Sequence, residues 1–289
     1  MDGLLIVNKP KGITSHDVCE KLKRILKTKK IGHTGTLDPM AEGVLVVAVG
    51  KATKLIQYLE NQEKAYVAEA LLGVETDTYD ILGHVLKEKK DFEINHNQVN
   101  KALANLKTKE SQIPPIYSAI KVNGKKLYDY ALQNLEVEIK ARPIKIKELN
   151  LLSLEKKDNQ WHVKFLVEAN KGFYVRSLIH DLGLELDTYA TMSSLIRVKA
   201  GIFTLDDCQT LAEIVEKEAK LLSIEEVFKD YPKVEVNDYI AKLTKSGLQF
   251  DERQFQGNSL FKVYNQGKLI AIYTPCGEKN YKPVVYLGE

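Results

Sequence analysis

The chain has 289 residues, of which 44% are hydrophobic and 28% are charged, with a net charge of +3 and a pI near 8.4. This composition is typical of a globular protein, and no apolar run approaches the roughly 18 residues of a membrane helix. The N-terminus lacks the pattern of a signal peptide, so we expect a cytoplasmic protein. The small net charge does not by itself indicate a nucleic-acid-binding protein.

The cysteines and histidines do not form the patterns of a disulfide framework or of a metal site. The three cysteines lie far apart and are odd in number, and none belongs to a CxxC pair. The six histidines form no HxxxH or HExxH pair. We therefore expect reduced, mostly buried thiols and no metal site.

The first 50 residues are predicted to contain a strand, a helix and a second strand. Residues 4–8 form a short apolar run that a Pro-Gly turn ends. Residues 14–27 have the periodicity of an amphipathic helix, with a capping box formed by Thr14 and Asp17. Residues 43–50 are almost continuously apolar, which predicts a strand buried on both faces.

The middle of the chain is predicted to mix strands and helices without a regular repeat. Its expected strands are residues 64–73, 83–88 and 193–205, its expected helices are 98–108 and 173–186, and its expected hairpin joins 144–155 to 161–169. Residues 112–134 are expected to form a Pro-marked turn, a strand, an Asn-Gly turn and a short helix.

Strands joined by hairpins, with helices placed irregularly between them, predict an α+β fold with a mixed, largely antiparallel sheet and flanking helices. From about residue 230 the chain contains short strands around glycine turns, which is typical of a small β-rich domain. We therefore predict a larger domain over residues 1–229 and a smaller one over residues 230–289.

The stretch "GHTGTLDPMAEG", residues 32–43, lies directly before the long apolar strand. Asp38 precedes Pro39, and Asp-Pro commonly opens turns, so the stretch is either a tight turn or an active-site loop. A loop attached to a rigid, buried strand is well placed to hold a catalytic group. The residues alone leave both interpretations open.

The stretch matches none of the common catalytic signatures. It fits neither the G-x-G-x-x-G nor the G-x-x-x-x-G-K-[ST] phosphate loop. No G-x-S-x-G elbow accompanies His33 and Asp38. A glycosidase would need a second carboxylate, and Glu42 is poorly placed for that role at the strand entrance. What remains is a lone carboxylate that acts as a nucleophile or a base.

Seven sequence blocks occur together in this chain: "LIVNKPKGITSHDV", "GHTGTLDPMAEGVLVVAVGKATK", "KAYVAEALLGVETDTYD", "PPIYSAIKVNGKKLYDYA", "ARPIKIKEL", "KGFYVRSLIHDLG" and "SSLIRVKAGIF". In order and spacing they resemble the bacterial TruB family of tRNA pseudouridine-55 synthases over roughly residues 3–205. The C-terminal segment is similar to the PUA RNA-binding domain that follows in that family. The resemblance implies the pseudouridine synthase fold and a cofactor-free isomerase that converts uridine 55 in the T loop of tRNA to pseudouridine.

The resemblance also assigns the central catalytic role. Asp38 would be the catalytic carboxylate, and it could attack ribose C1′, add to uracil C6 or remove the C2′ proton. Arg176 would pair with Asp38. A carboxylate in a dry pocket has a raised pKa, and an adjacent guanidinium keeps it ionised.

Further residues would hold the substrate. His33 would fill the space that the flipped-out base leaves, and Tyr66 would stack on the target uracil. Tyr174 and Leu195 would form pocket walls that exclude water. Lys9, in the family's Lys-Pro turn, would support the catalytic loop.

The implied partner is the T stem-loop of tRNA, with phosphate contacts from the lysine clusters at residues 27–30, 87–90 and 123–126. We expect no membrane and no obligate protein partner. The alternatives are a non-catalytic RNA-binding or RNA-folding protein on the same scaffold, or a synthase for a different uridine. The chain departs from the family pattern at Glu42, where a small hydroxylic residue is usual, and at Ile196, where an arginine is frequent.

Overall fold

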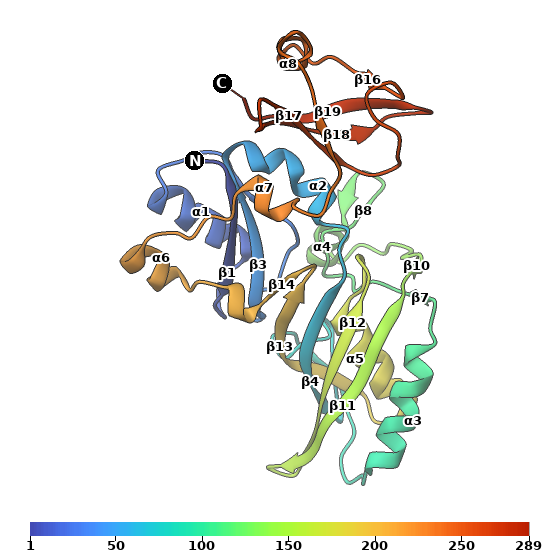
Figure 1. The fold of residues 1–289 in the computed structure, drawn as a ribbon. Helices are drawn as coiled ribbons and strands as arrows, with labels where there is room; N and C mark the ends of the chain where they lie inside the picture. The colour runs from blue at the N-terminus through green and yellow to red at the C-terminus, as the bar shows by residue number, and fades with distance from the viewer. Residues whose placement is uncertain (289) are drawn as a thin grey trace.

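A computed structural model describes residues 1–288. Its main sheet has the strand order β1-β3-β13-β4-β12-β11 (Figure 1). Along this path β3 and β13 run parallel and the other neighbours are antiparallel. The predicted α+β fold with a mixed, largely antiparallel sheet is therefore confirmed. These strands are β1 (Gly3–Lys9), β3 (Glu42–Val49), β13 (Ala190–Ala200), β4 (Lys64–Leu72), β12 (Gln160–Ala169) and β11 (Ile146–Lys157).

The β3 strand lies in the middle of the N-terminal part of the fold. Each of its residues after Glu42 is buried, as the continuous apolar run predicts. One face packs on helix α1 (Ser15–Ile25), which begins with the predicted capping box of Thr14 and Asp17. The short strand β2 (Ile31–His33) pairs with β3, so the loop at residues 34–41 is tied to a rigid element at both ends.

Helices α3 (His96–Lys107) and α5 (Val175–Glu185) cover one face of the sheet around β11, β12 and β13 (Figure 1). The predicted inner face of α5 is buried in the largest apolar cluster, and it consists of Val175, Leu178, Ile179 and Leu182. None of the helices within residues 1–288 is long and apolar enough to span a membrane.

The connecting elements of this part are short. The polar stretch after β4 contains a strand that the sequence did not predict, β5 (Val74–Thr76), which pairs with β6 (Val85–Glu88). The predicted Asn-Gly turn is present at Asn123 and Gly124, and both residues have a positive φ. The remaining elements are η1 (Gly50–Leu55), α2 (Ile56–Leu59), β7 (Ser111–Gln112), β8 (Lys121–Val122), β9 (Lys125–Lys126), α4 (Leu127–Leu132), β10 (Arg142–Pro143), β14 (Phe203–Thr204), η2 (Leu205–Asp207), α6 (Leu211–Lys217) and α7 (Ile224–Val227).

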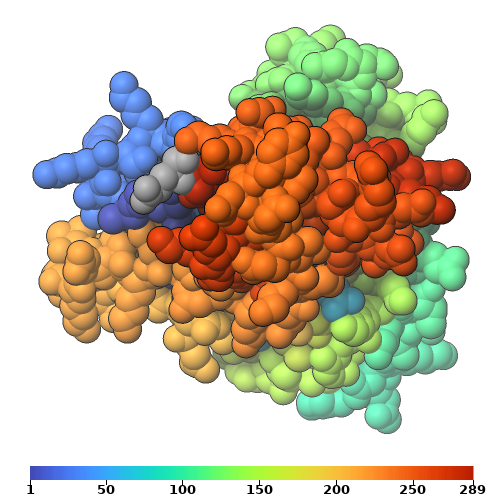
Figure 2. Space-filling model, turned by 45° about the horizontal axis from the view of Figure 1, so that its top comes forward, coloured from blue at the N-terminus to red at the C-terminus, as the bar shows by residue number. Residues whose placement is uncertain are grey.

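The C-terminal segment forms a second sheet, of order β15-β17-β18-β19-β16, with helix α8 beside it. Stacked aromatic rings fill its own core. This sheet lies at one end of the molecule and covers much of the face seen in Figure 2. Its elements are β15 (Lys233–Glu235), α8 (Asp238–Lys245), β16 (Phe250–Asp251), β17 (Phe261–Asn265), β18 (Lys268–Pro275) and β19 (Asn280–Tyr286).

Gly43, at the exit of the loop, allows β3 and β13 to approach each other. Its φ is +103°, and a Cβ at this position would lie 2.2 Å from the carbonyl oxygen of Arg197. We expect Gly43→Ala to lower the free energy of unfolding by about 1–3 kcal/mol through the positive φ alone, and by more through the clash. Urea unfolding measures this loss. Gly12→Ala is the matched control, because Gly12 has φ +89° but open space around its Cβ. Equal losses in the two variants would contradict the role of close approach.

Candidate active site

A cavity of about 780 Å³ opens beside the loop at residues 34–41. A cavity of this size accommodates a nucleotide. Its walls come from the loop, from β4 and β13, from the start of α5 and from the segment before β8. The structure brings together at this cavity the six residues that the family resemblance assigned to catalysis or substrate binding, namely His33, Asp38, Tyr66, Tyr174, Arg176 and Leu195.

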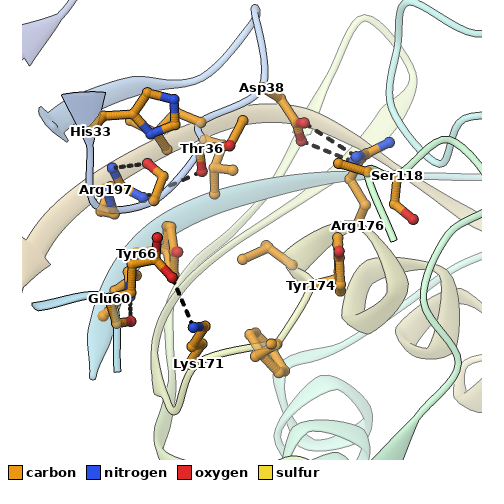
Figure 3. A pocket seen from close by; sticks show the side chains of 18 of the residues that line it. His33, Thr36, Asp38, Glu60, Tyr66, Ser118, Lys171, Tyr174, Arg176 and Arg197 are labelled. Atoms are coloured by element: carbon orange, nitrogen blue, oxygen red, sulfur yellow. Dashed lines mark hydrogen bonds and ion pairs between the residues drawn. The ribbon is translucent and has the colours of Figure 1, made fainter. Parts of the chain in front are cut away.

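Asp38 and Arg176 form a two-point ion pair (Figure 3). Nε of Arg176 lies 2.9 Å from Oδ2 of Asp38, and Nη2 donates to Oδ1 at 3.2 Å. The guanidinium also donates to the backbone oxygens of Thr78 and Tyr117 at 3.2 and 3.1 Å. The Arg176 side chain is only 7% exposed, whereas Asp38 is 31% exposed and faces the cavity. The arginine is thus fixed by its surroundings and holds the carboxylate in a defined orientation.

Opposing effects act on the acidity of Asp38. Burial, the largest effect, raises the pKa of its carboxyl group above the ordinary value. The charge and the hydrogen bonds of Arg176 lower this pKa, and the buried carboxylate of Asp80 raises it again. Asp80 itself lies 3.9 Å from Nη1 of Arg176. The carboxylate of Asp38 is therefore poorly solvated, and Arg176 is its main source of compensation.

Buried side chains fix the loop that carries Asp38 from one side. Lys9 is fully buried, and its Nζ donates to the carbonyl oxygens of Pro39 and Ala41 at 3.3 and 2.6 Å. Burial lowers the pKa of Lys9 to about 8. The hydroxyl of Ser15 accepts a hydrogen bond from the Leu37 amide at 2.8 Å. The supporting position of Lys9 thus has a clear structural basis.

Arg197 holds the same loop from the other side. Its side chain is 2% exposed. Its Nε donates to the oxygen of Val44 at 2.6 Å, and its terminal nitrogens donate to Gly35 and Thr36 at 3.1 and 3.4 Å. Since Lys9 and Arg197 bind loop carbonyls on both sides of Asp38, the loop is a preorganised support and not a simple turn.

Apolar and aromatic side chains form the wall opposite the loop. Tyr66 lies on β4, is partly buried and is the register partner of Arg197 on β13. Leu195 is 6% exposed. Tyr174 is the first residue before α5, and the side chain of Gln112 holds its backbone through hydrogen bonds of 2.9 and 3.0 Å. These walls give the cavity an apolar surface on which a planar base can lie.

His33 lies at the cavity next to Arg197 (Figure 3). Burial and the charge of Arg197 lower the pKa of His33, so its imidazole is neutral at physiological pH. Its Nδ1 is buried and has no hydrogen-bond partner among residues 1–288. This ring is therefore not held as a loop-capping histidine would be.

Sequence reasoning did not identify several polar residues of the site: Lys64, Asp80, Ser118, Arg142, Lys171 and Arg197. The polar run after β4 was the available signal for Asp80, and the alternation of β4 placed Lys64 on the same face as Tyr66. Of the three lysine clusters, only the one that contains Lys126 reaches the cavity. The two departures from the family pattern, Glu42 and Ile196, lie opposite each other where β3 pairs with β13.

Comparisons with known proteins define first the class of this protein. Residues 23–175 match the model of the TruB family pseudouridylate synthase N-terminal domain, and residues 176–229 match that of the tRNA pseudouridylate synthase B C-terminal domain. The fold resembles a chain in the crystal structure of a Cbf5-Nop10-Gar1 complex, with a TM-score of 0.71 and 26% identity over 99% of this chain and 84% of that one. The fold is that of the pseudouridine synthases.

Full-length relatives identify the family. A tRNA pseudouridine synthase B of Staphylococcus aureus is 40% identical and covers 98% of this chain and 98% of its own length. That of Bacillus subtilis is 40% identical over 95% of this chain and 93% of its own length. The chain belongs to the TruB family of pseudouridylate synthases.

Proposed function

We propose that this protein converts uridine 55 in the T loop of tRNA to pseudouridine, with Asp38 as its catalytic carboxylate. The observation that carries the proposal is the Asp38–Arg176 ion pair at the edge of an aromatic-walled cavity. The relatives bear the name tRNA pseudouridine synthase B, which supports tRNA as the substrate.

The reaction needs no added atoms. The bond between N1 of uracil and C1′ of ribose breaks, the ring turns, and a bond forms between C5 and C1′. C5 then loses its proton, and N1 carries a proton in the product. A carboxylate that is held ionised but weakly solvated can act as the nucleophile or base that assists bond cleavage. The protein must meanwhile hold the detached base. We assign this role to Tyr66, Tyr174 and Leu195, which line the cavity.

The target base must leave its stack to reach Asp38, and unstacking costs a few kcal/mol. A neutral, unpaired imidazole at the cavity can occupy the vacated space without adding a charge. We assign this role to His33. We also infer that residues 230–289 are a separate RNA-binding domain, because residues 233–286 form a sheet with an aromatic core of its own.

Incubation with an unmodified tRNA transcript tests the substrate. Pseudouridine is mapped by carbodiimide modification and primer extension, and we expect one new stop, in the T loop at position 55. A transcript in which uridine 55 is replaced by cytidine is the control and should give no stop. A single stop at another uridine would show that this uridine, and not uridine 55, is the target. The absence of a stop on any tRNA would overturn the proposal.

A further inference from the structure

Two cations at the cavity converge on one point of the catalytic loop. A Cβ built at Gly35 would lie 3.2 Å from Cε of Lys64 and 3.6 Å from Nη1 of Arg197. Both side chains line the cavity. Lys64 lies two residues before Tyr66 on the same face of β4, and Arg197 is the register partner of Tyr66. The two cations are thus grouped beside the proposed base-stacking ring.

The hydrogen bonds of both cations go to neutral backbone oxygens. Nζ of Lys64 donates to the carbonyls of Glu60 and Gln62, each at 3.0 Å. Arg197 donates to three carbonyls. An ammonium group has three N–H donors and a guanidinium has five. One donor of Lys64 and two of Arg197 therefore remain for a further acceptor.

Two other cations at the cavity, Arg176 and Lys171, have a carboxylate partner. Arg176 is paired with Asp38, and Nζ of Lys171 lies 2.9 Å from Oε2 of Glu60 (Figure 3). Within residues 1–288, neither Lys64 nor Arg197 has a carboxylate oxygen within 4.0 Å. Burial and the charges of Arg197 and Lys171 lower the pKa of Lys64 to about 8. A buried, unneutralised positive charge is unfavourable unless a ligand supplies an anion.

We propose that Lys64 and Arg197 form a subsite for one backbone phosphate of the RNA, namely a phosphate next to the nucleotide whose base lies on Tyr66. This inference rests on the proposed function, because it assumes that RNA enters the cavity. The location explains the choice of ligand. In a flipped nucleotide only one ribose separates the phosphate from the base, and here Lys64 lies two residues from Tyr66 on β4 while Arg197 lies opposite Tyr66 on β13. The phosphate would fix the backbone while the ribose–base bond is broken.

The subsite is tested by removing the charge of one phosphate of the RNA at a time. A T stem-loop RNA is synthesised with one neutral methylphosphonate at each linkage around the target uridine, in separate molecules, and KM and Kd are measured. We expect one linkage next to the uridine to raise both constants about tenfold in the wild-type protein. Lys64→Met should raise them by a similar factor with unmodified RNA, and the two changes combined should cause little further loss. Lys64→Arg keeps the charge and should keep the sensitivity to that linkage.

A lysine far from the cavity provides the control. Lys217 is exposed, is paired with Glu213 and does not line the cavity. The effects of Lys217→Met and of the methylphosphonate should therefore be independent, so that the combined change equals the product of the two. The slope of log Kd against log salt concentration should fall by about 0.7–0.9 in Lys64→Met, as expected for one lost phosphate contact. The subsite would be overturned if the effect of Lys64→Met multiplied with that of the methylphosphonate at every linkage. It would also be overturned if Lys64→Met left the salt slope unchanged. Because Kd needs no turnover, these outcomes are separate from the absence of pseudouridine, which would overturn the proposed function.

Discussion

Replacing Asp38 by asparagine is expected to slow pseudouridine formation at least about a thousandfold, with little change in RNA affinity. Asparagine has nearly the same shape and can still accept a hydrogen bond from Arg176, so the loop should keep its position. It lacks the negative charge that a nucleophile or base requires. The contacts of Lys9, Ser15 and Arg197 to the loop do not involve the Asp38 side chain.

Release of tritium from C5-labelled uridine in a tRNA transcript measures the rate, and filter binding measures Kd. Asp158→Asn serves as the control because it removes the same charge at the turn between β11 and β12, away from the cavity. Activity of Asp38→Asn within tenfold of wild type would exclude the proposed catalytic role. Loss of RNA binding together with activity would instead indicate that Asp38 acts in folding or docking. An inactive wild-type protein that binds tRNA would favour the non-catalytic alternative.

Local sequence patterns predicted most of the regular elements. The capping box of α1, the hairpin of β11 and β12, the buried run of β3 and the inner face of α5 depend on contacts within short segments, and each was confirmed. The short elements α2, α6 and α7 have four to seven residues. Helices of this length are too short to show a clear hydrophobic period. Their stability also comes from tertiary packing, which local sequence does not reveal.

The site was harder to predict because it is assembled over long distances. Asp38 and Arg176 are 138 residues apart, and the parallel pairing of β3 with β13 that supports the Asp38 loop leaves no pattern in either strand. The family resemblance, not the residues alone, suggested Arg176. Lys64 and Arg197 were missed because their hydrogen bonds go to carbonyl groups, which every residue has and no sequence pattern marks.

Removal of the Arg176 charge is expected to move the acid limb of the reaction's pH profile to higher pH. Burial and Asp80 raise the pKa of Asp38, and Arg176 lowers it. In Arg176→Met the pKa of Asp38 should therefore rise further. If Asp38 acts as a carboxylate, activity must fall wherever it is protonated. The acid limb of kcat/KM should move to higher pH, so that the variant loses more activity at low pH than at high pH.

Two further variants separate charge from structure. Arg176→Lys retains a positive charge without the two-point contact, so its acid limb should move less than that of Arg176→Met. Asp80→Asn removes a negative charge that raises the pKa of Asp38, so its acid limb should move to lower pH. A loss in Arg176→Met that is uniform across pH would mean that the arginine acts mainly through its bonds to the backbone of Thr78 and Tyr117. Opposite shifts at Arg176 and Asp80 would instead establish that their charges set the ionisation of one shared carboxylate, Asp38.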